Sequence, residues 1–157
     1  RRRGYAVRMT TPAATAAAPP AHLGWRLLAL VYDAMPNIAL WFAVSAAALA
    51  LRPSHEAFAA WSLGQWALWA MCWGVSGAYA VHSWRRSGQT LGMGPWRLKV
   101  TDRQGQPASA GALWLRYAVA TLSLLALGLG FAWSLFERER RTWHDLASGT
   151  VLRRLPR

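Results

Sequence analysis

Three long apolar runs constrain the fold of this chain more than any other feature of its sequence. They cover about residues 27–51, 57–81 and 117–136, and Asp33 is the only charged residue within the first. A helix of about 20 apolar residues crosses the roughly 30 Å of hydrocarbon in a bilayer. The runs therefore predict an all-α membrane protein with three transmembrane helices.

The composition agrees with the membrane class and indicates what the chain contacts. Of the 157 residues, 54% are hydrophobic and 15% are charged, and the apolar residues form runs instead of alternating with polar ones. The net charge of +12 would suggest nucleic acid as the partner of a soluble protein. Because the basic residues lie between the apolar runs, we expect anionic lipid head groups as the partner and no nucleic acid.

The segment before the first run has a different composition. Residues 1–21 begin with three arginines and continue as a tract rich in Thr, Ala and Pro, which cannot bury enough apolar surface to fold. We expect a flexible tail there and a single membrane domain over residues 22–157. No cofactor and no metal site are predicted, because the sequence shows no metal-ligand spacing.

The first run carries a polar stripe. At about 100° per residue, Arg26, Asp33 and Asn37 fall within about 40° of one helical face. An ionisable group inside a membrane helix is expensive and usually has a function. Pro36 lies close to Asp33 and removes a backbone hydrogen bond, which leaves a carbonyl free near the acid. The stripe predicts a polar pocket in which Asp33 binds a cation or a proton. A plain structural kink at Pro36 is the alternative, because proline is common in membrane helices.

The basic residues between the runs predict the orientation. Lys and Arg number five in residues 1–26, one between the first two runs, six in residues 85–116 and six in residues 138–157. The N-terminus and the loop 82–116 are therefore predicted to be cytoplasmic. Three spans would leave the basic C-terminal tail outside. A break at Gly128-Leu129-Gly130 would instead make a re-entrant pair of short helices and return the tail to the cytoplasm.

The loop after the second run has an order of its own. Residues 96–102 alternate apolar and polar side chains and residues 103–107 are turn-like, which predicts a short strand and hairpin. Residues 150–154 could pair with that strand, and this would favour the returned tail. Residues 88–92 are too short for a nucleotide-binding loop, and we expect them to cap the second helix.

Three motifs, in this order, resemble those of the RDD family of small prokaryotic membrane proteins. They are residues 26–33, residues 88–92 followed by 98–102, and residues 140–150. The matching positions of the second and third motifs include Gly88, Gln89, Thr90, Gly92 and His144. The resemblance implies a multi-pass protein of the prokaryotic inner membrane.

The family's name refers to one arginine and two aspartates. The arginine and the first aspartate match Arg26 and Asp33, and the second aspartate matches Asp145 in preference to Asp102. Where the family usually has a lysine after the second motif, this chain has Met93. Any role of that lysine therefore does not transfer to this chain.

Two functions follow from these residues and from the resemblance. The family implies transport of an unknown ligand or cation/proton antiport, with the charge state of Asp33 as the switch. The alternative is a non-catalytic membrane assembly or partner-binding subunit, in which Arg26 pairs with Asp33 or with Asp145. An enzyme is not expected, because no nucleophile or phosphate-binding motif is present. A homo-oligomer and a membrane-protein partner both stay open.

Overall fold

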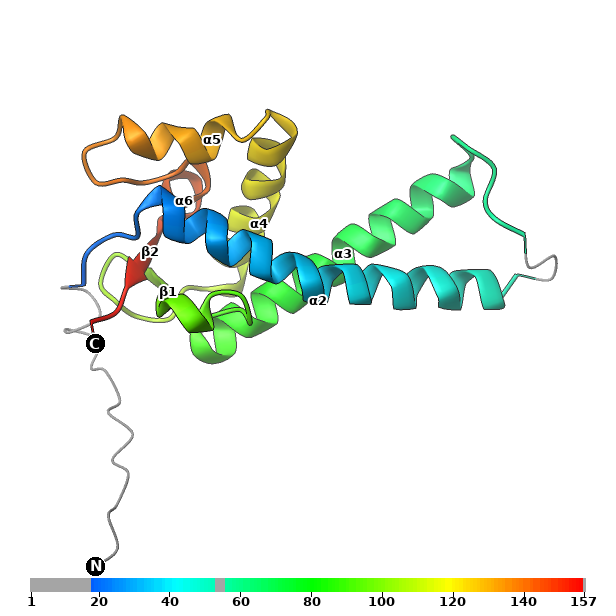
Figure 1. Ribbon diagram of the computed structural model, residues 1–157, viewed down its shortest axis with the longest axis horizontal. Helices are drawn as coiled ribbons and strands as arrows, with labels where there is room; N and C mark the ends of the chain where they lie inside the picture. The colour runs from blue at the N-terminus through cyan, green and yellow to red at the C-terminus, as the bar shows by residue number, and fades with distance from the viewer. Residues whose placement is uncertain (1–17, 53–55, 157) are drawn as a thin grey trace, which may run out of the picture.

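Two long helices form the main body of the computed structural model, which describes residues 18–52 and 56–156. They are α2 (Leu23–Ala50) and α3 (Leu63–Ser87). The two helices cross, and their linked ends reach away from the other elements (Figure 1). Helix α3 lies later in the chain than the predicted span 57–81, because Ser62 caps its first turn and Gly88, in the left-handed conformation at φ 76°, ends it. The predicted capping role of residues 88–92 is confirmed.

A small sheet lies at the opposite end from the α2–α3 connection. Strand β1 (Leu98–Asp102) follows the short helix η1 (Gly94–Trp96) and pairs antiparallel with β2 (Thr150–Arg154). The predicted strand and its pairing with residues 150–154 are confirmed. The sheet brings the C-terminal segment beside the loop after α3, although the two are far apart in sequence (Figure 1).

The residues before α2 also contact this sheet. A bridge joins Pro20 to Arg153, and the Ala21 amide donates to the Leu152 carbonyl at 2.8 Å. Most of the predicted flexible tail, residues 1–17, lies outside the described residues. The chain therefore enters α2 from the same end of the molecule that holds β1 and β2.

The third apolar run is bent, so the prediction of one continuous helix over 117–136 is wrong. Helix α4 (Ala110–Leu125) is followed by α5 (Leu129–Ala132) and η2 (Trp133–Leu135), and the two parts meet at 107°. The break has a local cause. Leu127 and Gly128 take φ values of 54° and 79°, which a helix cannot contain. The bend falls at the position where the glycine pattern suggested a re-entrant pair.

Membrane character rests most clearly on α2. Within the described residues, α2 alone is a single unbroken helix that is long and apolar enough to cross a membrane. Helix α4 joins it only if the bent pair of α4 and α5 is counted as one span. Many large apolar side chains of α2 face outward, with Phe42 76% and Met35 73% exposed. An apolar face of this kind suits lipid better than water. The prediction of three spans is not confirmed.

The buried core gathers around the sheet. Leu98 and Leu113 are almost fully buried and pack with apolar residues from α2, α3 and β2. Helix α4 approaches α3 closely at Gly77, where an added Cβ would overlap the Trp114 ring, whereas a Cβ on Gly74 would meet nothing. This core holds α2, α3 and α4 in the arrangement that shapes the site described next.

Candidate functional site

One buried aspartate joins three helices. Asp145 lies on α6 (Trp143–Ser148) and is 1% exposed. Its Oδ2 lies 2.7 Å from Nη1 of Arg26 on α2, and its Oδ1 contacts Nη1 of Arg116 on α4. The ion cluster of Arg26, Arg116 and Asp145 therefore ties α2, α4 and α6 together.

The start of α6 sets the direction of the Asp145 side chain. Thr142 caps the helix by accepting a hydrogen bond from the Asp145 amide, and Oδ2 of Asp145 accepts one from the Thr142 amide at 3.2 Å. This reciprocal capping box is specified by residues three apart in sequence. It leaves the carboxylate aimed at the two arginines.

The two arginines are held by further acceptors. Nε of Arg26 donates to the Ala21 carbonyl at 3.0 Å, and its Nη2 donates to the Arg140 carbonyl at 3.1 Å. Nη1 of Arg116 also donates to Oγ1 of Thr150 at 2.7 Å. A buried ion pair is stable only when such additional hydrogen bonds satisfy the charged groups.

The cluster carries a net positive charge. Burial on its own would raise the pKa of Asp145, but the charges of Arg116 and Arg26 outweigh that effect and hold the pKa well below its ordinary value. Burial, helped by the charge of Arg116, lowers the pKa of the neighbouring His144 to about 3. At neutral pH two guanidinium groups therefore face one carboxylate and a neutral imidazole.

Asp33 lies in a second polar cluster with different partners. Its Oδ1 accepts hydrogen bonds from the Tyr79 hydroxyl at 3.3 Å and the Gly92 amide at 2.9 Å. Its Oδ2 accepts one from the Thr90 hydroxyl. Among the residues that the structure describes, no cationic side chain forms an ion pair with Asp33. Three neutral donors thus hold this carboxylate.

The loop over residues 88–92 is built around Asp33. Gly92 sits so close to α2 that a Cβ would overlap the Ala29 carbonyl oxygen and the Asp33 carboxyl carbon. The loop is fixed to the sheet at its other end. The Gly88 carbonyl accepts from the Val100 amide at 2.8 Å, and Nε2 of Gln89 donates to the Leu98 carbonyl at 2.7 Å. The glycine is therefore required by close approach to α2.

The structure separates the residues that the sequence placed on one stripe. Of the two partners considered for Arg26, it brings Asp145 into contact and not Asp33. Nδ2 of Asn37 donates to the Asp33 backbone carbonyl at 2.7 Å, so Asn37 stays with Asp33. Asp102 lies at the end of β1, where its Oδ1 accepts from the Gln106 amide.

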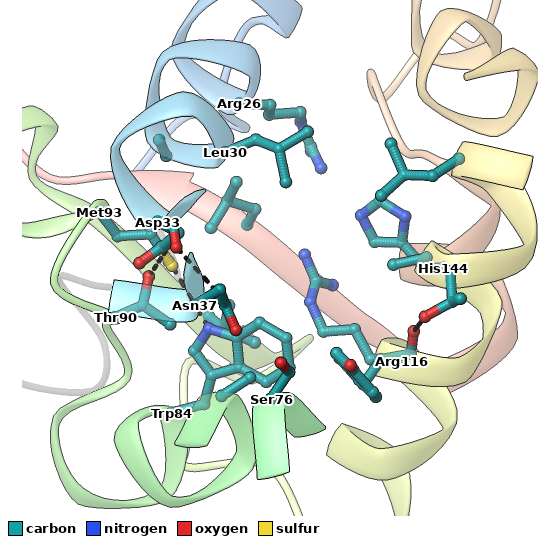
Figure 2. Close-up of a pocket in the computed structure, with 18 of the residues that line it drawn as sticks. Arg26, Leu30, Asp33, Asn37, Ser76, Trp84, Thr90, Met93, Arg116 and His144 are labelled. Atoms are coloured by element: carbon teal, nitrogen blue, oxygen red, sulfur yellow. Dashed lines mark hydrogen bonds between the residues drawn. The ribbon is translucent and has the colours of Figure 1, made fainter. Parts of the chain in front are cut away.

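A cavity of about 160 Å³ lies between the two clusters. Figure 2 shows Asp33 and Thr90 on one side of it, with Arg116 and His144 on the other. Two residues that line it each have a buried side-chain atom without a hydrogen-bond partner, Oδ1 of Asn37 and Nδ1 of His144. Its other polar lining residues are Arg26, Ser76, Tyr79, Tyr117 and Thr121.

Sequence reasoning missed two residues of this site. Arg116 entered only as one of the loop charges, although it stands directly before the uncharged third run and inside a helix. A cation at that place in a membrane helix is itself a signal of a buried partner. Tyr79 had no recognisable signal, because a tyrosine near the end of an apolar run is ordinary.

The described part of the chain offers no cluster of metal ligands. Over residues 18–52 and 56–156, no group of three or more His, Cys, Asp and Glu side chains could hold a metal ion. The polar groups of the cavity are instead hydroxyls, guanidinium groups, the amide of Asn37, the imidazole of His144 and one carboxylate. Such a lining can bind a small polar or charged molecule.

Comparison with known proteins gives one match. The model of the RDD family matches residues 20–149, a range that includes Asp33, the loop 88–92 and the ion cluster of Arg26, Arg116 and Asp145. No curated protein and no solved structure is similar enough to match this chain.

Proposed function

This chain belongs to the RDD family, and on that premise we propose that it is a membrane transporter in which Asp33 binds a cation, a proton or a small cationic ligand. The observation that supports the proposal is the set of partners of Asp33. Three neutral donors hold the carboxylate, no cation is paired with it among the described residues, and it lines a cavity.

The physical reasoning concerns the charge of Asp33. An unpaired carboxylate within a membrane helix is costly, so it takes up a proton or a counter-ion. A carboxylate has about four lone-pair directions, and three donors use most but not all of them. The remaining capacity is available to a ligand in the cavity. Binding and release there would change the charge of the site, which is the step that transport requires.

We also propose a topology with two spans and one re-entrant segment. Helices α2 and α3 cross the membrane, and α4 with α5 enters it and returns. The pairing of β1 with β2 supports this topology, because two segments that share a sheet are expected to lie on one side of a membrane. Both segments are basic, so this side is cytoplasmic by the positive-inside rule, in a prokaryotic inner membrane.

Protease access tests the topology. In intact spheroplasts the C-terminal tail is expected to resist an added protease and to be cut only after the membrane is opened. Digestion of the tail in intact spheroplasts would exclude the re-entrant form and restore three spans.

Flux measurements test the transport function. Purified protein in lipid vesicles is expected to carry protons or sodium ions, and Asp33→Asn should lower that flux at least tenfold. Asp102→Asn is the matched control, because Asp102 lies at the end of β1 and outside the cavity lining. Flux that Asp33→Asn leaves unchanged would exclude the proposal.

The alternative is a non-catalytic assembly or partner-binding subunit. The bonds from Thr90 and Gly92 favour it, because through them Asp33 fastens the loop 88–92 to α2. In that case Asp33→Asn would lower the amount of protein in the membrane, and the wild-type chain would co-purify with another membrane protein while carrying no ions. Normal amounts of a flux-deficient Asp33→Asn protein would favour transport.

A further inference from the structure

The two sides of the cavity carry opposite charge. On one side the carboxylate of Asp33 has only neutral donors around it. On the other side the ion cluster contains two arginines and one aspartate, with His144 neutral at physiological pH. Each side therefore holds one uncompensated charge, negative at Asp33 and positive at the cluster.

Arg116 still has donors to offer on the positive side. Its Nη1 donates hydrogen bonds to Asp145 and Thr150. Its Nε and Nη2 form no hydrogen bond with the residues that the structure describes. Arg116 lines the cavity, and its guanidinium group points into it (Figure 2). Nε and Nη2 of a guanidinium group form a fork that suits a carboxylate.

Unpartnered buried atoms indicate that the cavity holds a polar occupant. Nδ1 of His144, a residue only 4% exposed, and Oδ1 of Asn37 both lack a hydrogen-bond partner. Buried polar atoms are normally paired with protein, water or ligand. The two atoms lie on elements at opposite sides of the cavity, α6 for His144 and α2 for Asn37. A polar occupant that reaches both sides of the cavity could form a hydrogen bond with each of these two atoms.

The size of the cavity limits that occupant. Its volume is about 160 Å³, and a protein cavity of roughly 150 Å³ is known to hold a benzene molecule of six carbons. The space between the charged sides is lined by apolar side chains, among them Leu30, Leu124 and Phe131. A ligand with a charge at each end and methylene groups between them matches this lining.

We infer that the cavity binds a small zwitterion, an amino carboxylate of about six to eight non-hydrogen atoms. Its ammonium group binds Asp33 and its carboxylate binds the free edge of Arg116. The inference rests on the proposed function in so far as both use Asp33 as the group that recognises positive charge. It adds the second charged contact, which a simple cation would not use.

Calorimetric titration of the purified protein in lipid nanodiscs tests the inference. The probes are glycine, β-alanine and 4-aminobutyrate, which separate the two charges by increasing numbers of methylene groups, with butyrate and butylamine as single-charge controls. At least one zwitterion should bind ten times more tightly than either control. If no zwitterion exceeds both controls, the inference is wrong.

Two variants test which protein group binds each end of the ligand. In Asp33→Asn, the affinity for the best zwitterion should fall to that for butyrate while butyrate binding is unchanged, because only the ammonium contact is lost. A folding defect would lower both affinities. Arg116→Lys keeps the charge beside Asp145 but removes the guanidinium fork, so it should weaken zwitterion and butyrate binding about equally and leave butylamine binding unchanged. Unaltered zwitterion binding in either variant would contradict the assignment.

Ion flux measured on the same protein separates this inference from the proposed function. Asp33-dependent flux of protons or sodium ions, with no preference for a zwitterion, would refute the inference and leave the transport function standing. Tight zwitterion binding by a protein that carries neither ion nor zwitterion would refute transport and leave the binding site standing.

Discussion

Asp145 and Asp33 are the same residue type in the same small molecule, yet they are held in opposite ways. Asp145 is 1% exposed and meets two guanidinium groups. Asp33 is half-buried, meets a hydroxyl from each of two side chains and one backbone amide, and lines a cavity. The comparison separates an enclosed acid whose ionic partners connect three helices from an acid beside a cavity that has no cationic partner among the described residues.

Replacing Asp145 should produce the largest effect. Asp145→Asn leaves two arginines buried without a counter-charge, and removal of one partner from a buried ion pair costs about 3–5 kcal/mol. We expect a matching loss in the free energy of unfolding, measured by thermal or denaturant unfolding in detergent. Asp102→Asn, at the end of β1, is the control and should lose far less. Equal losses in the two variants would show that the cluster is not a structural connection.

Acid should weaken the same region through His144. Its pKa is lowered from 6.5 to about 3 in the folded protein, so between these values the unfolded chain binds the proton more readily. Stability is therefore full above about pH 6.5 and falls as the pH is lowered toward 3. Acidification from pH 7 to pH 4 should cost about 3 kcal/mol.

The control for this prediction is a protein without the imidazole. His144→Asn should show a smaller loss of unfolding free energy between pH 7 and pH 4, because it has no ring to protonate. A pH dependence that is the same in both proteins would mean that His144 is not the group responsible.

Gly92 tests how tightly the loop 88–92 packs on Asp33. In Gly92→Ala the new methyl group would overlap the Ala29 carbonyl oxygen and the Asp33 carboxyl group, and overpacking of this kind costs about 1–3 kcal/mol. Gly94→Ala is the matched control, because a Cβ there would meet nothing. We expect lower unfolding free energy and altered ion flux only in Gly92→Ala. Equal behaviour of the two variants would contradict the close approach of the loop.

The smallest expected change comes from the Tyr79 hydroxyl. Tyr79→Phe removes one of the three side-chain and backbone donors to Asp33, which should cost about 1 kcal/mol of stability. Because the charged carboxylate is then less well solvated, flux should change more than stability. Tyr32→Phe, on an exposed residue of α2, controls for loss of a hydroxyl. If flux is equal in both variants, the Tyr79 bond has no part in the site.

Several features could be read from local sequence alone. The apolar run of α2, the strand at β1 and the cap at Gly88 each depend on residues close together in the chain. The break at Gly128 was recognisable as an alternative because glycine allows the positive φ that ends a helix. The apolar length of residues 117–136 nevertheless predicts one continuous helix, because it carries no information about where a helix bends.

The pairing of charges could not be read in the same way. Helical periodicity places Arg26 and Asp33 on one face of α2, but it does not say what lies opposite each of them. Only the packing of α2, α4 and α6 decides that Arg26 and Arg116 share Asp145, and only the loop 88–92 brings Thr90 and Gly92 to Asp33. Motifs and helical periodicity depend on residues that are neighbours in the chain. The partner of a buried charge depends instead on contacts between segments that are far apart in the sequence.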